Sequence, residues 1–320
     1  MTRDGARAST AAIWTALVTV YVVWGSTYLG IRVVVEAGIP PLLGMGARFL
    51  AAAALLMGFL AARRGLYSLR ISWRELRSAA IVGSLLLLGG NGLVAVAERT
   101  VPSGLAALIV GAVPLWFVLL RVGGGERPRG LTWLGVIIGF VGIAAISLPR
   151  GGIDGVQAWG VLVILAATLF WAIGSYYSPR LSLPSGAMVA TAYEMLAGGA
   201  IMTVVGFAVG EANEFNVGAV PTEGWVALSY LVVVGSILGY TAYIFALGNA
   251  PLSVVGTYAY VNPVVAVILG ALILSEPVTA VVLGGGLLVV AGVALVLRGE
   301  RQPAPVDDVD LRLPEPVRSG

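Results

Sequence analysis

The sequence predicts an all-α polytopic membrane protein with ten transmembrane helices. Of its 320 residues, 58% are hydrophobic and only 11% are charged. Soluble domains carry roughly 25% charged residues, so this chain cannot cover a water-facing globule of its size. The apolar residues also gather into runs of about 20, the length that a helix needs to cross the hydrocarbon core of a bilayer.

The ten runs are separated by residues that end helices, chiefly proline, glycine and arginine. We expect spans at residues 12–31, 42–62, 78–97, 104–122, 131–148, 156–177, 186–210, 225–248, 252–274 and 278–297. The first run is long enough to span and ends in no small-residue cleavage site, so we do not interpret it as a signal peptide. The chain then divides into a tail at 1–11, two halves at 12–150 and 151–298, and a polar, proline-rich tail at 299–320 that we expect to be disordered.

The arginines predict the orientation of the chain. With the N-terminus in the cytoplasm, the inside segments hold 15 arginines and the outside segments hold three, Arg32, Arg99 and Arg150. Cytoplasmic loops of membrane proteins carry such an excess of basic residues. Both termini are therefore expected in the cytoplasm, and the basic charge of the chain reflects its topology and not binding to nucleic acid.

Missing residue types exclude several kinds of chemistry. The chain contains no histidine, cysteine or lysine, so it has no thiolate nucleophile, no Cys- or His-ligated metal and no P-loop lysine for an ATP-driven pump. The aspartates, which a metal-dependent intramembrane enzyme would need within its spans, all lie outside them: Asp4, Asp154, Asp307, Asp308 and Asp310. We expect no enzyme, cofactor or metal site, and lipid or acyl transfer is the weaker alternative.

An internal repeat relates the two halves. At an offset of 150 residues, Ser103 corresponds to Ser253, Glu126 to Glu276, Gly135 to Gly285 and Gly142 to Gly292, and Pro114 meets Pro263 with a slip of one residue. Because each half has five spans, an odd number, the two copies enter the membrane from opposite sides. Such inverted repeats are typical of secondary transporters, whose substrate site lies near the midplane between the halves.

Four short motifs carry a resemblance to a known family. They are Trp24–Leu29 in the first span, Arg48–Leu50 in the second, Gly90–Gly92 with Ala97 and Glu98 around the third, and Tyr258–Pro263 in the ninth. On these motifs the chain resembles the drug/metabolite transporter superfamily over residues 12–298, in its ten-helix form with two EamA-type repeats, and within it the YedA-like inner-membrane exporters. The resemblance implies a multi-pass protein of the bacterial inner membrane that exports small metabolites, amino acids or drugs by alternating access.

Two ionisable residues lie deep inside spans, Arg48 in the second and Glu194 in the seventh. A charge near the bilayer centre costs about 2.5–3.5 kcal/mol on insertion scales, so each needs a partner or a wet cavity. Because the second and seventh spans are repeat mates, we expect the two charges to approach each other. Two interpretations stay open: a structural pair that locks the halves, or a site in which Arg48 attracts a substrate carboxylate and Glu194 carries a coupling proton for antiport.

Polar and aromatic side chains at depth predict where a small-molecule substrate binds. The candidates are Trp24, Ser26, Tyr28, Arg48, Asn91, Trp171, Ser175, Tyr243, Tyr258 and Asn262. Any single Trp or Tyr also fits packing or an interfacial belt, whereas a buried Asn amide needs partners. Pro114 and Pro263 interrupt the fourth and ninth spans, and we expect helix kinks there that border the cavity.

The fifth and tenth spans consist largely of small and aliphatic residues, with Gly135-x-x-x-Gly139 in one and three consecutive glycines, 284–286, in the other. Small residues let helices approach closely, so we interpret these spans as scaffold or as the face of a homodimer. Glu126 and Glu276 precede a proline at the start of these spans. We expect each carboxylate to stabilise the N-terminus of its own following helix.

A secondary active transporter, driven by proton antiport, is the leading prediction for the function. A facilitative channel or an uptake permease of the same fold is the alternative. Saturable flux that can be driven by counter-transport separates a carrier from a channel.

Overall fold

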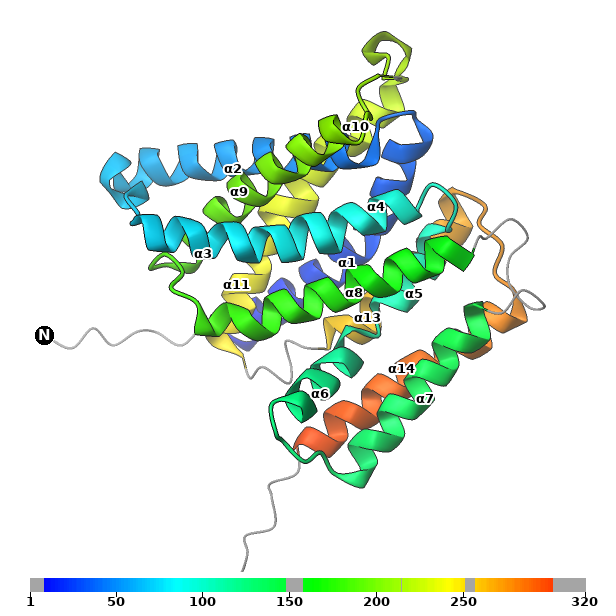
Figure 1. Cartoon of the computed structure of the whole chain (residues 1–320). Coiled ribbons are helices and arrows are strands. Elements are labelled where there is room, and N and C mark those ends of the chain that lie inside the picture. Colours follow the sequence, from blue (N-terminus) through cyan, green and yellow to red (C-terminus); the bar gives the residue numbers. More distant parts are fainter. Residues whose placement is uncertain (1–8, 148–157, 214, 251–256, 302–320) are drawn as a thin grey trace, which may run out of the picture.

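The computed structural model describes residues 9–147, 158–213, 215–250 and 257–301 (Figure 1). Every regular element in these ranges is a helix. Eight helical stretches are long and apolar enough to cross a membrane, and two shorter apolar helices, Gly130–Ala145 and Val261–Ile273, bring the spans within these ranges to the expected ten. Residues 1–8 and 302–320, and with them the predicted disorder of the C-terminal tail, lie outside the described residues.

The first half runs from α1 to α7. Its spans are α1 (Thr10–Glu36), α2 (Pro41–Arg64), a third made of α3 (Trp73–Gly83), η2 (Ser84–Gly92) and α4 (Leu93–Ala97), a fourth made of α5 (Ser103–Val110) and α6 (Val113–Gly123), and α7 (Gly130–Ser147), with the short turn η1 (Leu66–Leu69) after α2. Local sequence signals explain where several of these helices begin or end. Gly65 ends α2 with a φ of 77°, which favours glycine, and Ser72 and Glu75 form a capping box at the start of α3.

The second half repeats this order of spans. It comprises α8 (Ala158–Tyr177) with the turn η3 (Ser178–Arg180), α9 (Ala187–Ala208), the turn η4 (Val217–Ala219), an eighth span made of α10 (Thr222–Tyr230), η5 (Leu231–Leu238) and α11 (Gly239–Asn249), then α13 (Tyr258–Ile273) and α14 (Ala280–Arg301). The third and eighth spans, which are repeat mates, each contain a π-helical stretch, η2 and η5. Such stretches are rare and recur at functional sites, so the shared irregularity supports the repeat.

The fifth and tenth spans pack against each other as α7 and α14, side by side in Figure 1. A Cβ added to Gly135 would lie 2.6 Å from the Gly292 carbonyl oxygen, and one added to Gly142 would lie 2.7 Å from that of Gly285. Gly135 and Gly285 are repeat mates, and so are Gly142 and Gly292. The two contacts are therefore equivalent, as a twofold relation between the halves requires. The glycine stripe is therefore used within the chain, and the predicted homodimer, which stays a prediction, has only the other faces of these helices available.

The second and seventh spans form another pair of packed mates, α2 and α9. A Cβ added to Gly46 would lie 3.2 Å from the Gly199 carbonyl oxygen, and one added to Gly199 would lie 3.2 Å from that of Gly46. Small residues thus let the two backbones touch on this side of the bundle as well.

The fourth and ninth spans pack against each other near Pro263. The fourth span is interrupted between α5 and α6, just before Pro114, and α13 carries Pro263 within it. A Cβ added to Gly111, at the break, would lie 2.9 Å from Cγ of Pro263. The break in the fourth span therefore lies against Pro263, and α5 packs on α13.

Large apolar side chains are exposed around the bundle, including Val18, Leu55, Leu162, Val204 and Leu287. Such a surface is unfavourable in water and suits lipid. The segments that join α1 to α2, α4 to α5, α9 to α10 and α13 to α14 lie at one end of the bundle (Figure 1). In the orientation that the arginines predict, this is the outer end, and it is named the predicted outer end below.

Candidate functional site

An aromatic cluster joins α1 to the eighth and ninth spans. The Trp24 ring lies against Tyr240, Tyr243 and Tyr258, with ring centroids 5.4, 5.0 and 5.4 Å away, and Tyr243 and Tyr258 are 6.0 Å apart. Edge-to-face and tilted arrangements of this kind hold aromatic rings in fixed positions. Three predicted site residues, Trp24, Tyr243 and Tyr258, are thus brought together with Tyr240.

Hydrogen bonds tie the same helices next to this cluster. The Tyr21 hydroxyl bonds to the Thr257 hydroxyl. The side chain of Asn262 is buried, and its amide nitrogen, when turned toward carbonyl oxygens, donates to Tyr21 and Tyr258 at 3.2 Å each. Asn262 therefore joins α1 to α13, and its amide has the partners that a buried polar group requires.

Arg48 is buried on α2, where its guanidinium faces the eighth span. Its Nε donates to the Ser236 hydroxyl at 3.0 Å, Nη1 lies 3.7 Å from the Met45 sulfur, and its Cζ stands 4.8 Å from the centre of the Phe49 ring. No carboxylate of the described residues lies within salt-bridge distance of this guanidinium. The charge is therefore held at depth by a hydroxyl and a ring, without an anion.

The structure forms no ion pair between Arg48 and Glu194, although both charges act electrostatically on the same Tyr240, so an ion-paired lock between the halves is absent. Each residue lies seven positions after the first residue of its helix, and α2 and α9 start at opposite ends of the bundle. At about 1.5 Å per residue, each charge lies roughly 10 Å from its own end of a helix that is about 30–35 Å long. An inverted repeat places equivalent residues at equal distances from the midplane, on opposite sides of it. Because each of these residues lies nearer the start of its helix than the end, the two are separated along the membrane normal.

Glycines of the eighth span link Arg48 to the aromatic cluster. A Cβ added to Gly235 would lie 3.3 Å from Nη2 of Arg48, and one added to Gly239 would lie 2.6 Å from Nε1 of Trp24. These glycines are four residues apart, so they share one helix face. The guanidinium and the Trp24 ring therefore lie one helical turn apart on the same surface of η5 and α11.

The other predicted site residues lie in different surroundings. Ser26 bonds to the Val23 carbonyl at 2.8 Å and to the Tyr230 hydroxyl at 2.6 Å, and Tyr28 packs toward the core around α5. Asn91 and Trp171 belong to the contact between η2 and α8, where a Cβ added to Gly90 would lie 2.8 Å from the Trp171 ring.

Ser175 is half-buried on the same helix, α8. That the Trp24 cluster and the residues at η2 and α8 (Asn91, Trp171 and Ser175) line one shared cavity stays a prediction.

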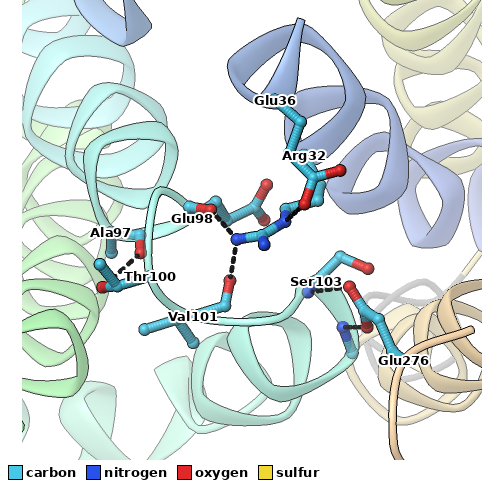
Figure 2. A network of polar contacts seen from close by, with 9 residues as sticks. Arg32, Glu36, Ala97, Glu98, Thr100, Val101, Ser103 and Glu276 are labelled. Carbon is cyan, nitrogen blue, oxygen red and sulfur yellow. Dashed lines mark hydrogen bonds and ion pairs between the residues drawn. The ribbon is translucent and has the colours of Figure 1, made fainter. Parts of the chain in front are cut away.

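A polar network lies at the predicted outer end, and Figure 2 shows it. Arg32 on α1 bonds to the carboxylate of Glu36 at 2.5 Å and to the backbone carbonyl oxygens of Glu98 and Val101. Across from it, the Glu276 carboxylate accepts hydrogen bonds from the backbone N–H groups of Ser103 and Gly104, at 2.7 and 3.0 Å. These residues (Arg32, Glu36, Glu98, Val101, Ser103, Gly104 and Glu276) are named the outer network.

Glu276 therefore binds the N-terminus of a distant helix, α5, and the expectation that it serves its own following helix is wrong. Glu211 binds in the same way, since it accepts from the N–H groups of Leu42 and Leu43 at the start of α2, at 3.2 and 2.9 Å. Two carboxylates of the second half thus compensate helix dipoles of the first half. Glu126, the repeat mate of Glu276, is exposed and faces Arg121 at 3.8 Å.

Three residues with notable contacts or burial have no predicted site role: Ser236, Tyr230 and Glu98. Ser236 and Tyr230 lie within and just before the π-helical η5, and no sequence period announces such a stretch. Glu98 follows an apolar span and directly precedes Arg99, a setting that is typical of a solvated loop residue. The structure instead buries it completely.

The ten apolar helices define a multi-pass membrane protein, and polar side chains such as Arg48 and Asn262 are buried within it. The model of the EamA-like transporter family matches residues 10–148 and 158–298, nearly the whole of both halves. The chain therefore belongs to the EamA-like transporter family of the drug/metabolite transporter superfamily, as its motifs predicted.

Two curated relatives and one solved structure are similar to the chain. The uncharacterized inner membrane transporter YedA of Escherichia coli (strain K12) is 43% identical over 257 residues, which cover 80% of each chain. The uncharacterized transporter YvbV of Bacillus subtilis (strain 168) is 27% identical over 258 residues, or 80% of this chain and 82% of its own. A crystal structure that is 21% identical, with a TM-score of 0.63, covers 92% of this chain and 100% of its own, and shows the shared fold.

Proposed function

We propose that the protein is a secondary active transporter of the bacterial inner membrane, with both termini in the cytoplasm, that exports small carboxylate-bearing metabolites such as amino acids by alternating access. The observation that carries the substrate class is the buried Arg48 guanidinium, which has no carboxylate partner among the described residues. A buried cation at membrane depth is costly without an anion, so a bound substrate carboxylate would supply the missing charge. The Trp24 cluster, one helical turn away, offers an apolar surface for the rest of the substrate.

Alternating access is supported by the asymmetry of the two ends. Glu276 is engaged with Ser103 and Gly104 at the predicted outer end, while its repeat mate Glu126 is exposed at the other end. An inverted repeat whose equivalent residues differ in this way is typical of a carrier captured in one of two related states. In this scheme the outer network is closed.

Purified protein in liposomes tests the function. Radiolabelled amino acids and other small carboxylates are loaded on one side, with their amides as neutral analogues of the same shape, and uptake is followed with excess unlabelled compound on the other side. We expect counter-transport of carboxylates that saturates with concentration, and little transport of the amides. Flux that does not saturate and shows no counter-transport would identify a channel, and inward flux coupled to a gradient would identify an uptake permease.

Glu194 remains our candidate for the coupling carboxylate. Since no ion pair joins it to Arg48, the structural lock loses its basis, and Glu194→Gln is expected to leave the protein folded. If Glu194 carries the proton, this substitution abolishes export driven by a pH gradient but retains exchange of substrate for substrate. Both fluxes are measured in liposomes, with the exposed Glu223→Gln as the matched control. Full gradient-driven export by Glu194→Gln would contradict the assignment.

A further inference from the structure

Glu98 is a completely buried acid at the predicted outer end. It directly follows α4, the last helix of the third span. Its side chain is 0% exposed, and neither carboxylate oxygen has a hydrogen-bond partner among the residues that the structure describes. Buried polar groups nearly always have partners, and an ionised carboxylate without one is among the least favourable groups that a protein interior can hold.

The charged neighbours of Glu98 are engaged elsewhere. Arg32, whose positive charge acts on Glu98, uses Nε for the Glu36 carboxylate and Nη1 for backbone carbonyl oxygens, one of which belongs to Glu98 itself (Figure 2). Arg99, the next residue, turns toward Glu211 at 3.7 Å. The outer network therefore uses the backbone of Glu98 and leaves its carboxylate without a donor.

Other groups around Glu98 act electrostatically. Glu36 and Tyr28 face it from α1, and Glu276 faces it from the segment before α14. Burial raises the pKa of the Glu98 carboxyl well above its usual range, Glu276 raises it further, Arg32 lowers it, and Glu36 raises it. The acids together with burial outweigh the single guanidinium, so the neutral form fits the closed network.

We propose that Glu98 is a proton-binding site built into the outer network, whose carboxyl holds a proton while the network is closed and releases it to external water when the network opens. The proposal rests on the alternating access proposed above. Opening separates Arg32 from the Glu98 and Val101 carbonyls and Glu276 from α5, so water reaches the Glu98 carboxyl. An exposed glutamate has an ordinary pKa of about 4.3 and is ionised at neutral pH.

The direction of the pH effect follows from linkage. The closed state binds one proton more than the open state at pH values above the ordinary pKa of a glutamate and below the raised pKa of the buried carboxyl. Closure is therefore favoured when the external pH falls, and opening is favoured when it rises. The ligand of this site is a proton, because one unpartnered carboxyl offers too few oxygens for a metal cation.

The chain has no cysteine, so a single introduced thiol reports on the opening of the outer network. Leu105 is buried and lines a narrow cavity beside Glu276, so Leu105→Cys places the thiol behind the network. Labelling by a membrane-impermeant maleimide is measured in liposomes while the external pH is varied. Val217→Cys, which is exposed at the same end, corrects for the pH dependence of thiol reactivity.

We expect the corrected labelling of Leu105→Cys to rise at least tenfold as the external pH rises, along a one-proton curve. Glu98→Gln, a permanent mimic of the neutral acid, should remove this dependence and keep labelling low, while Glu98→Asp should retain it. Glu223→Gln, an exposed acid at the same end that is not part of the network, should retain it too. The proposal is overturned if the Glu98→Gln variant keeps the pH profile, or if no variant shows one.

Two further arms keep the outcomes distinct. Labelling needs no substrate, so a flat pH profile in a protein that still shows counter-transport overturns the proton site and leaves the transporter function standing. Labelling that responds to sodium at constant pH, and not to pH itself, would identify a cation site and overturn proton binding. Protonation is also read directly, since the infrared spectrum of the closed protein should contain a protonated-carboxyl band that is missing in Glu98→Gln and shifted in Glu98→Asp.

Discussion

Gly292→Val is expected to prevent the protein from accumulating in a folded form. A Cβ at this position would lie 2.5 Å from the Gly139 amide nitrogen and 2.6 Å from the Gly135 carbonyl oxygen. Both contacts are to backbone, so no side-chain rotation relieves them, and α7 and α14 must move apart along their whole interface. Overpacking of a well-packed core costs about 1–3 kcal/mol, and we expect the upper end of this range or more here.

The chain supplies a matched control on the same helix. A Cβ added to Gly284, also on α14, meets nothing within 4 Å. Gly284→Val is thus the same chemical change with the same helix propensity, and its stability should stay within about 0.5 kcal/mol of the parent protein. The measurement is the monodisperse yield and the melting temperature in mild detergent. Equal values for the two variants would show that α7 and α14 do not pack in this register.

The spans were predictable because the bilayer imposes a simple constraint. Every backbone N–H and C=O group in the hydrocarbon core must form its hydrogen bond within its own helix, so an apolar run of about 20 residues is expected to form a membrane-spanning helix. The π-helical η2 and η5 were not predictable, because they lie within continuous apolar runs and leave no period in the sequence. The partner of Glu276 was missed for a related reason, since a carboxylate next to a helix start has an obvious local partner and its actual partner, α5, is 173 residues away.

The candidate site was predictable in its residue types but not in its pairing. The sequence predicts Trp24, Tyr243, Tyr258 and Asn262 at depth, and the structure gathers all four around α1 and α13. The sequence also identifies Arg48 as a charge that needs a partner. Whether it forms an ion pair with its repeat mate Glu194 could not be predicted, because an inverted repeat places equivalent side chains at mirrored depths unless they lie at the midplane itself.

Arg48→Gln is expected to lower transport of carboxylate substrates by about 10- to 100-fold, chiefly as a higher KM. Hydrogen bonds to charged groups contribute about 1.5–3 kcal/mol, and each 1.4 kcal/mol corresponds to a tenfold change in affinity. Gln keeps a donor near Ser236 but removes the charge. Arg48→Lys should be intermediate, because an ammonium lacks the planar fork that matches a carboxylate. Transport of the neutral amide analogues should not fall.

The stability of the Arg48→Gln variant distinguishes a role in substrate binding from a purely structural role. If Arg48 were half of a buried ion pair, Arg48→Gln would leave an unpaired carboxylate and destabilise the protein by about 3–5 kcal/mol. Because no described carboxylate lies within reach of Arg48, the variant should instead melt at or above the temperature of the parent protein, since a costly buried charge is gone. Arg180→Gln, which removes the same charge from an exposed site, is the control for both measurements and should change neither. Unchanged KM values for carboxylates in a folded Arg48→Gln variant would show that the guanidinium does not meet the substrate.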